Sequence, residues 1–160
     1  RADFVKVLDF GLVKHGGSGG QDDIKLTRAD TVTGTPAFLA PEIARGAEAD
    51  GRTDIYAMGC VAYWLLTGKL VFDKESSLQA AIAHVQEEPA PPSTRSELEI
   101  PEDLERVIMN CLKKDPDQRP QTVWQLARML QACTSSSSWS EEQATKWWQI
   151  HQPQASVATA

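Results

Sequence analysis

The stretch from Asp54 to Gly68, DIYAMGCVAYWLLTG, is apolar on every face when it is wound as a helix. A surface helix carries one apolar stripe, whereas a helix that is apolar all round is buried. Gly68 stands where a helix commonly ends in the left-handed conformation. The longest apolar run, Ile55 to Leu66, has 12 residues, whereas a membrane-spanning helix needs about 20. The stretch therefore predicts a helix at the centre of a soluble domain, and no membrane segment in this chain.

The composition is typical of one soluble globular domain. A chain of 160 residues can bury a single sizeable core. Its formal net charge of -6 argues against binding to nucleic acid or anionic lipid, which requires clustered Lys and Arg. The three cysteines are odd in number and far apart, which is typical of reduced thiols in the cytoplasm. The three histidines are isolated, so we expect no zinc site.

Four further helices are predicted by apolar stripes and by residues that begin or end helices. The stretch SSLQAAIAHVQEE opens with Ser76 and Gln79 in the spacing of a capping box, and we expect this helix to be half exposed. The other three are PEDLERVIMNCLKKDP, TVWQLARML and SEEQATKWWQIH. The residues expected on the apolar faces are, helix by helix, Leu78, Ile82 and Val85; Leu104, Val107, Ile108, Cys111 and Leu112; Val123, Leu126, Ala127 and Leu130; and Ala144, Trp147, Trp148 and His151. We expect the two neighbouring tryptophans to pack onto their own domain.

The residues before Pro36 are less periodic. Phe4 to Leu8 is a short β-prone run that predicts a buried strand ending at Asp9. From Leu12 to Thr35 no period is sustained, and the stretch HGGSGGQDD has the composition of a mobile loop. Loops of this length within a compact domain are commonly functional. The run GGSGG lacks the spacing of a phosphate-binding loop, so a flexible linker is the better interpretation.

Four short stretches occur in an order and at spacings that are informative about the family. They are DFG at Asp9 to Gly11, GTPAFLAPE at Gly34 to Glu42, DIYAMG at Asp54 to Gly59, and DPDQRP at Asp115 to Pro120. Together they resemble the C-terminal lobe of protein kinases, and the first two are related to known kinase signatures. Any one of them alone is weak, but four in order at compatible spacings are specific. The resemblance runs from Phe4 to about Cys133, and the kind of kinase it indicates is a bacterial, eukaryotic-like serine/threonine kinase.

The resemblance implies a protein-kinase-like α+β fold, of which this chain is the mainly α-helical C-terminal lobe from the DFG strand onward. The N-terminal lobe and the catalytic loop are then absent. The expected domains are a partial kinase domain over residues 1–133 with an activation segment over 9–42, a helical extension over 134–152, and the start of a linker over 153–160. The opening RADFVKVLDF has no initiator Met, so we expect an excerpt of a longer protein.

The resemblance also implies a site for ATP and Mg²⁺. Asp9 matches the aspartate that binds the Mg²⁺ bridging the ATP phosphates, because a hard carboxylate oxygen suits a hard cation. Phe10 and Gly11 complete this cofactor-binding group, and Phe10 would set whether Asp9 points inward. Thr35 resembles the catalytic-site threonine of enzymes that act on Ser and Thr hydroxyls, with Pro36 to Leu39 as the floor under the acceptor residue. If DFG stood alone, Asp9 would be a plain turn residue.

Three threonines of the loop are candidate sites of activating phosphorylation. Thr31 is the favoured position, three residues before Gly34, and Thr33 and Thr27 are weaker candidates. A phosphate would add up to about two negative charges and could order the loop by pairing with Arg. The alternative is that these are plain solvated threonines.

Three scaffold residues are implied as well. Glu42 and Arg119 match a buried ion pair that ties the end of the activation segment to the last helices. Asp54 resembles a carboxylate that accepts backbone hydrogen bonds from the catalytic loop, and it could equally be a simple helix cap.

Several parts of a kinase do not occur in this sequence. They are the Gly-rich loop, the strand Lys with its helix Glu, and the H-R-D catalytic loop with its Asn. We therefore expect the isolated chain to be inactive and the longer protein to phosphorylate protein substrates in the cytoplasm, with a membrane anchor after Ala160 left open. The alternative function is a non-catalytic pseudokinase or scaffold that holds partners with the Ser76 to Glu87 helix and with the face carrying Trp147 and Trp148.

Overall fold

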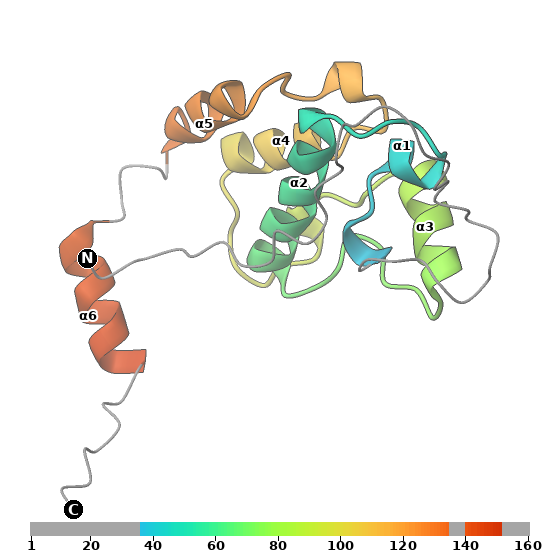
Figure 1. Ribbon diagram of the computed structural model, residues 1–160. Helices are drawn as coiled ribbons and strands as arrows, with labels where there is room; N and C mark the ends of the chain where they lie inside the picture. The colour runs from blue at the N-terminus through green and yellow to red at the C-terminus, as the bar shows by residue number, and fades with distance from the viewer. Residues whose placement is uncertain (1–35, 135–139, 152–160) are drawn as a thin grey trace, which may run out of the picture. The chain divides into compact units, whose positions relative to one another are not determined.

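The computed structural model describes residues 36–134 and 140–151 (Figure 1). Within these ranges the chain forms helices and no strand. The helices, in chain order, are η1 (Pro36–Phe38), α1 (Pro41–Ala44), α2 (Gly51–Thr67), α3 (Ser77–Gln86), η2 (Pro92–Thr94), α4 (Glu102–Cys111), η3 (Pro116–Gln118), α5 (Val123–Gln131) and α6 (Glu141–His151). The helical part of the expected fold is thus present, whereas the predicted strand before Asp9 lies outside the described residues.

The described residues fall into two units, 36–134 in one and 140–151 in the other. Helix α6 belongs to the second unit. It begins after Ser140, whose Oγ accepts a hydrogen bond from the backbone N–H of Gln143 at 3.2 Å. The rings of Trp147 and Trp148 meet edge to face, with centroids 4.8 Å apart. The sequence predicted this helix correctly; the packing of its tryptophans onto the kinase-like residues stays a prediction.

Helix α2 is the longest helix of the first unit, and polar groups mark both of its ends. It begins at Gly51, where the carboxylate of Asp50 accepts the backbone N–H of Arg52 at 2.8 Å and the Asp50 N–H reaches Thr53 Oγ1 at 3.3 Å. This reciprocal arrangement satisfies N–H groups that have no partner inside the helix. The helix ends at Gly68, in the left-handed conformation with φ 67°, as the sequence predicted.

The two faces of α2 have different surroundings. One face is buried and carries Ile55, Tyr56, Gly59, Cys60 and Tyr63. The other carries large apolar side chains that are exposed, namely Met58, Val61, Trp64 and Leu65. The expectation that this helix is buried on every face is therefore wrong for the described part of the chain. An all-apolar sequence favours the burial of every face of the helix. The neighbouring elements decide which face is actually covered.

Gly59 sits where α2 crosses α4. A Cβ atom at this position would lie 2.7 Å from the Cβ of Cys111 and 3.2 Å from Cδ2 of Leu112. Real Cβ atoms do not approach this closely, so the missing side chain is what allows the two helices to pack here. The sequence did not single this glycine out.

The core forms two clusters, and α2 and α4 contribute residues to both. The larger contains Tyr56, Cys60, Tyr63, Phe72 and Leu112 among its buried members. The smaller joins α2, α4 and α5 and consists of Ile55, Val107, Cys111, Leu126 and Cys133. The stripe predicted for α4 is confirmed, because Val107, Ile108, Cys111 and Leu112 are all buried and Leu104 packs against both clusters.

The faces predicted for α3 and α5 are largely wrong. Helix α3 begins at the predicted cap, where Ser76 Oγ accepts the backbone N–H of Gln79 at 3.2 Å. Its buried residues, however, are Ala80, Ala83 and His84, whereas Leu78 and Ile82 are exposed. In α5 only Leu126 is buried, and Val123 and Leu130 are exposed. Small residues on α3 allow a close approach to α1 and η1, so side-chain size outweighed hydrophobicity in choosing the buried face.

Candidate functional site

The catalytic and cofactor-binding residues predicted from the sequence, and the three candidate phosphorylation sites, lie outside the described residues. These are Asp9, Phe10, Gly11 and Thr35, and Thr27, Thr31 and Thr33. The predictions made for them therefore stand as predictions. The described part of the candidate site begins at Pro36, inside the GTPAFLAPE stretch, and includes everything that holds this stretch in place.

The segment from Pro36 to Glu42 lies against α2 and α3. Its first turn is η1, closed by a hydrogen bond from Leu39 N to Pro36 O at 3.2 Å. Ala40 and Pro41 are buried, and α1 begins there with Pro41 at its first position. Because η1 contacts both α2 and α3, and α1 contacts α3, the segment is bounded by elements far along the chain (Figure 1).

Glu42 and Arg119, which the sequence predicted to pair, lie together in the structure. Arg119 Nη1 donates to Glu42 Oε1 at 2.8 Å and Arg119 Nη2 donates to Glu42 Oε2 at 2.7 Å. The Arg119 side chain is 0% exposed and that of Glu42 is 10% exposed. This two-bond geometry matches the planar guanidinium to the carboxylate and is the stronger form of such pairs.

Every N–H donor of the Arg119 guanidinium has an acceptor. Besides the two bonds to Glu42, Nε donates to Lys113 O at 2.8 Å, Nη1 to Arg52 O at 2.9 Å, and Nη2 to Lys114 O at 3.3 Å. The guanidinium also lies over the ring of Tyr56, with its central carbon 4.8 Å from the ring centroid. Arg119 thus joins the end of α4, the first turn of α2 and the start of α1.

Glu42 remains ionised in this setting. Burial by itself would raise the pKa of Glu42, but the hydrogen bonds from Arg119, from its own backbone and from Thr53 hold that pKa below its ordinary value. Thr53 Oγ1 donates to Glu42 Oε1 at 2.9 Å, so the carboxylate is bound to α2 as well as to Arg119. The pair is therefore charged on both sides and fully hydrogen-bonded.

Asp54 is exposed, in the first turn of α2. Within the described ranges its carboxylate has no hydrogen-bond partner. The interpretation of Asp54 as the helix cap is wrong, because α2 begins three residues earlier than the apolar pattern indicated and Asp50 is the cap. Its other predicted role, toward a catalytic loop, remains a prediction.

His84 is a residue of the candidate site that sequence reasoning missed. Its ring is 0% exposed, with Nδ1 2.8 Å from Tyr56 Oη and Nε2 3.1 Å from the carbonyl oxygen of Ala37 in η1. No local signal could have identified it, because Ala37 lies 47 residues earlier in the chain and has no functional side chain.

The buried cysteines offer no reactive thiol. Burial raises the pKa of Cys60 to about 12 and that of Cys111 to about 11, so both are protonated at neutral pH. Both are core residues, as the sequence predicted. Between residues 36 and 151, leaving out 135–139, no group of three or more His, Cys, Asp or Glu side chains could hold a metal ion.

Comparison with known proteins agrees with this geometry and with the motif order. Residues 1–134 match the protein kinase domain family model. This chain belongs to the protein kinase domain family. The match covers the segment around η1 and α1, the helices α2 to α5, and the Glu42–Arg119 pair that ties them together.

Two of the similar proteins come from bacteria. The chain is 44% identical over 131 residues to the serine/threonine-protein kinase pkn3 of Myxococcus xanthus, which covers 81% of this chain and 24% of the relative. It is 42% identical over 118 residues to the serine/threonine-protein kinase PknB of Mycobacterium tuberculosis, covering 74% of this chain and 18% of that protein. The chain therefore spans about a quarter or less of the length of these relatives.

None of the helices within the described ranges combines the length and the apolar character that crossing a bilayer requires.

Proposed function

We propose that this chain is the C-terminal lobe of an ATP-dependent serine/threonine protein kinase. The longer protein that contains it would transfer the γ-phosphate of ATP to Ser and Thr hydroxyls of protein substrates. The observation that carries the proposal is the identity of 44% and 42% to two proteins named serine/threonine-protein kinases, over most of this chain. The anchoring of the Pro36 to Glu42 segment supports it, because a substrate-binding floor must be held rigidly.

The proposed metal ligand in this chain is Asp9. A carboxylate oxygen has the donor chemistry that Mg²⁺ prefers. When bound, Mg²⁺ and ATP supply the transferable phosphoryl group and the neutralisation of its charge. Phe10 and Gly11 would position Asp9, and Thr35 would lie beside the reacting hydroxyl.

The activating modification is proposed at Thr31, with Thr33 and Thr27 as weaker candidates. A phosphate at Thr31 would bring charge into the loop that leads to Thr35 and η1. Mass spectrometry of the longer protein after incubation with ATP tests this placement, and phosphate confined to residues outside 27–33 would contradict it.

The exposed apolar face of α2 supports the proposal that further parts of the same domain precede this chain. Met58, Val61 and Leu65 are 48%, 43% and 69% exposed on one helix face. Soluble proteins rarely expose a contiguous apolar patch unless another surface covers it. In the longer protein, we propose that residues upstream of this chain cover this face.

The proposal makes opposite forecasts for the isolated chain and for the longer protein. Phosphoryl transfer depends on positioning and electrostatics from both halves of the cleft, so the 160 residues alone should transfer no phosphate. The longer protein should phosphorylate a generic Ser/Thr protein substrate in the presence of ATP and Mg²⁺. Radiolabelled phosphate on the substrate is the measurement, and turnover by the isolated chain above the blank would contradict the first forecast.

Asp9 is tested in the longer protein by Asp9→Asn. This change keeps the size of the side chain and removes the charge, so turnover should disappear while the circular dichroism spectrum and the melting temperature stay as they are. Asp23→Asn, the same change in the HGGSGGQDD stretch, should leave turnover at the wild-type level. Retained turnover in Asp9→Asn would remove Asp9 from the mechanism.

A second candidate function is a non-catalytic module that holds protein partners. It is favoured by Leu78 and Ile82, which are 66% and 46% exposed on α3. Phosphoryl transfer distinguishes the two functions, since a scaffold would show none in the longer protein. Sequencing the residues upstream of this chain is a simpler way to distinguish the two functions, because a kinase requires the strand Lys and the H-R-D catalytic loop there.

A further inference from the structure

His84 is a fully buried histidine that lies between α2 and the η1 turn. Its Nδ1 is 2.8 Å from the hydroxyl of Tyr56 in α2, and its Nε2 is 3.1 Å from the carbonyl oxygen of Ala37 in η1. The rings of Tyr56 and Phe72 both meet the imidazole edge-on, with centroids at 5.7 Å and 5.0 Å. The imidazole therefore connects three elements through its two nitrogens and its ring edges.

The hydrogen-bond partners determine where the proton of His84 lies. The Ala37 carbonyl can only accept, so Nε2 carries the hydrogen and donates it. Nδ1 is then the acceptor and takes the hydrogen of the Tyr56 hydroxyl. Burial lowers the pKa of His84 to about 4, and the nearby charge of Lys114 contributes to this shift, whereas the hydrogen bond to Ala37 opposes it. The ring is therefore neutral near pH 7.

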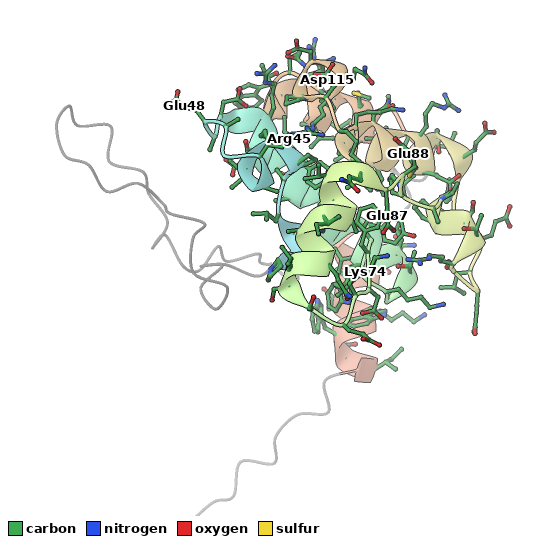
Figure 2. All side chains as sticks on the ribbon, turned by 90° about the vertical axis from the view of Figure 1, so that its right-hand side faces the viewer. Arg45, Glu48, Lys74, Glu87, Glu88 and Asp115 are labelled. Atoms are coloured by element: carbon green, nitrogen blue, oxygen red, sulfur yellow. The ribbon has the colours of Figure 1, made fainter. Side chains whose placement is uncertain are left out.

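The backbone that carries His84 is also held in place. Lys114 Nζ donates to the His84 carbonyl oxygen at 2.8 Å, and Arg45 Nη2 donates to the Val85 carbonyl oxygen at 3.2 Å. Two cations thus occupy the C-terminal end of α3, where they also interact favourably with the helix dipole. Lys74, just before α3, pairs with Glu87 at its end, with Nζ and Oε1 2.8 Å apart (Figure 2). Three side chains from outside α3 therefore hold the C-terminal end of the helix, next to His84.

Ala37 depends on a partner from outside its own turn. It lies in the middle of η1, a turn of three residues that the bond from Leu39 N to Pro36 O helps to close. A turn of this length has little stability by itself. The bond from His84 Nε2 adds a restraint from α3 on the peptide unit at the centre of the turn.

We propose that His84 is a positioning residue for the protein substrate: its Nε2–H holds the Ala37 carbonyl and so sets the orientation of the Pro36 to Leu39 floor under the acceptor peptide. This inference rests on the proposed kinase function, because it assigns that floor to the substrate. It makes His84 act on peptide binding through Ala37, without contact to ATP or to the reacting atoms.

Two substitutions separate this role from simple packing. His84→Gln places an amide N–H near the Nε2 position and can still reach the Ala37 carbonyl, but it takes the acceptor away from Tyr56. His84→Asn places its amide near the Nδ1 position, where it can still meet Tyr56, but it is too short to reach Ala37. Both variants are neutral amides, so a purely structural role would make them similarly damaging.

The test is steady-state kinetics of the longer protein with a Ser/Thr peptide and ATP. We expect His84→Asn to raise the KM for the peptide roughly 3- to 10-fold, which corresponds to the loss of one hydrogen bond. The KM for ATP should not change. His84→Gln should restore the peptide KM to near the wild-type value, although its melting temperature falls. Amide hydrogen exchange at Leu39 should become faster in His84→Asn and not in His84→Gln.

The outcomes are separable. Wild-type protein that phosphorylates nothing contradicts the proposed function itself. Active wild-type protein with an unchanged peptide KM in His84→Asn overturns only the role of His84. Equal rises of the peptide KM and the ATP KM in both variants would show a structural residue and also overturn it. His84→Gln tests the inference on its own if His84→Asn does not fold, because a raised peptide KM in the Gln variant contradicts it.

Discussion

Two contacts between the Asp115 to Gln121 stretch and the helices before it use the same chemistry in different surroundings. Arg119 pairs with Glu42 in the interior, where its side chain is 0% exposed. Arg52, in the first turn of α2, pairs with Asp50 and with Asp117, whose side chain is 81% exposed. Both arginines donate to carboxylate oxygens at hydrogen-bond distance, so the contact with the carboxylate alone does not distinguish the two sites.

Burial distinguishes them. At the exposed site, water and salt compete with the carboxylates of Asp50 and Asp117, so such pairs contribute about 0 to 1 kcal/mol. At the buried site, removing one partner leaves the other charged and without a counterion, which costs about 3 to 5 kcal/mol. The comparison teaches that the number of ion pairs is a poor guide to what holds the candidate site together. The predictions below apply similar changes to the buried and the exposed region.

The largest effect is expected from Glu42→Gln. This change keeps the size of the side chain but leaves the buried Arg119 without its counterion, so the free energy of unfolding should fall by about 3 kcal/mol. Urea unfolding followed by circular dichroism measures it. A loss below about 1 kcal/mol would place this pair in the same class as the exposed one.

The second largest effect is expected from acid, which should lower the free energy of unfolding through the buried region. His84 has its pKa lowered to about 4 in the folded chain, compared with an ordinary value of 6.5. The unfolded chain therefore binds more protons between these values, and stability is lost as the pH falls from about 6.5 toward 4, by on the order of 2 to 3 kcal/mol. Glu42, with its lowered pKa, adds a further loss that begins below about its ordinary value of 4.5.

The variant His84→Gln isolates the histidine contribution in this titration. It lacks the imidazole, so its unfolding free energy should change less than that of the wild type between pH 6.5 and 5, where Glu42 stays ionised. Parallel curves for the two proteins in that window would contradict the assignment of the acid sensitivity to His84.

Gly59→Ala should destabilise the α2–α4 crossing by about 1 to 3 kcal/mol, because the new Cβ meets the Cβ of Cys111 at 2.7 Å and the helices must move apart. Gly51→Ala is the matched control in the exposed first turn of α2, where an added Cβ meets nothing within 4 Å. It should raise stability by about 0.4 to 1 kcal/mol, because Ala restricts the unfolded chain. Thermal unfolding of the two variants should therefore shift in opposite directions.

The smallest loss is expected from Asp117→Asn. It removes the exposed partner of Arg52 and should lower the free energy of unfolding by less than about 1 kcal/mol. High salt should remove even this difference from the wild type, because exposed charges are screened. Glu42→Gln should keep most of its effect in the same salt. An Asp117→Asn effect that persists unchanged in high salt would contradict the contrast between the two regions.

Sequence patterns predicted the helices far better than the faces that they bury. The cap at Ser76 was read correctly, since its side chain accepts the backbone N–H of Gln79, and the stripe of α4 was correct as well. These are local relations, and backbone geometry at three- and four-residue spacing is enough to define them. The faces of α2, α3 and α5 were misjudged because hydrophobicity does not say where a neighbour lies.

The candidate site shows the same division. Glu42 and Arg119 could be named in advance because the motifs that contain them occur together in one family. Asp54 was mistaken for a possible cap because the polar start of α2, at Asp50, lies outside its apolar run. His84 had no signal in the sequence, since its function in the structure comes from a backbone carbonyl that carries no side-chain chemistry.

The sequence by itself determined where the helices α2 to α6 lie, that Ser76 caps α3, and to which family the motif order points. Only the tertiary structure decided which face of α2 is covered, that Gly59 marks a helix crossing, and that a buried histidine holds the turn at Ala37. The physical reason is the separation along the chain of the residues that interact. Helix formation and capping are settled among residues a few positions apart, whereas burial and the partners of buried polar groups depend on residues brought together from distant parts of the chain.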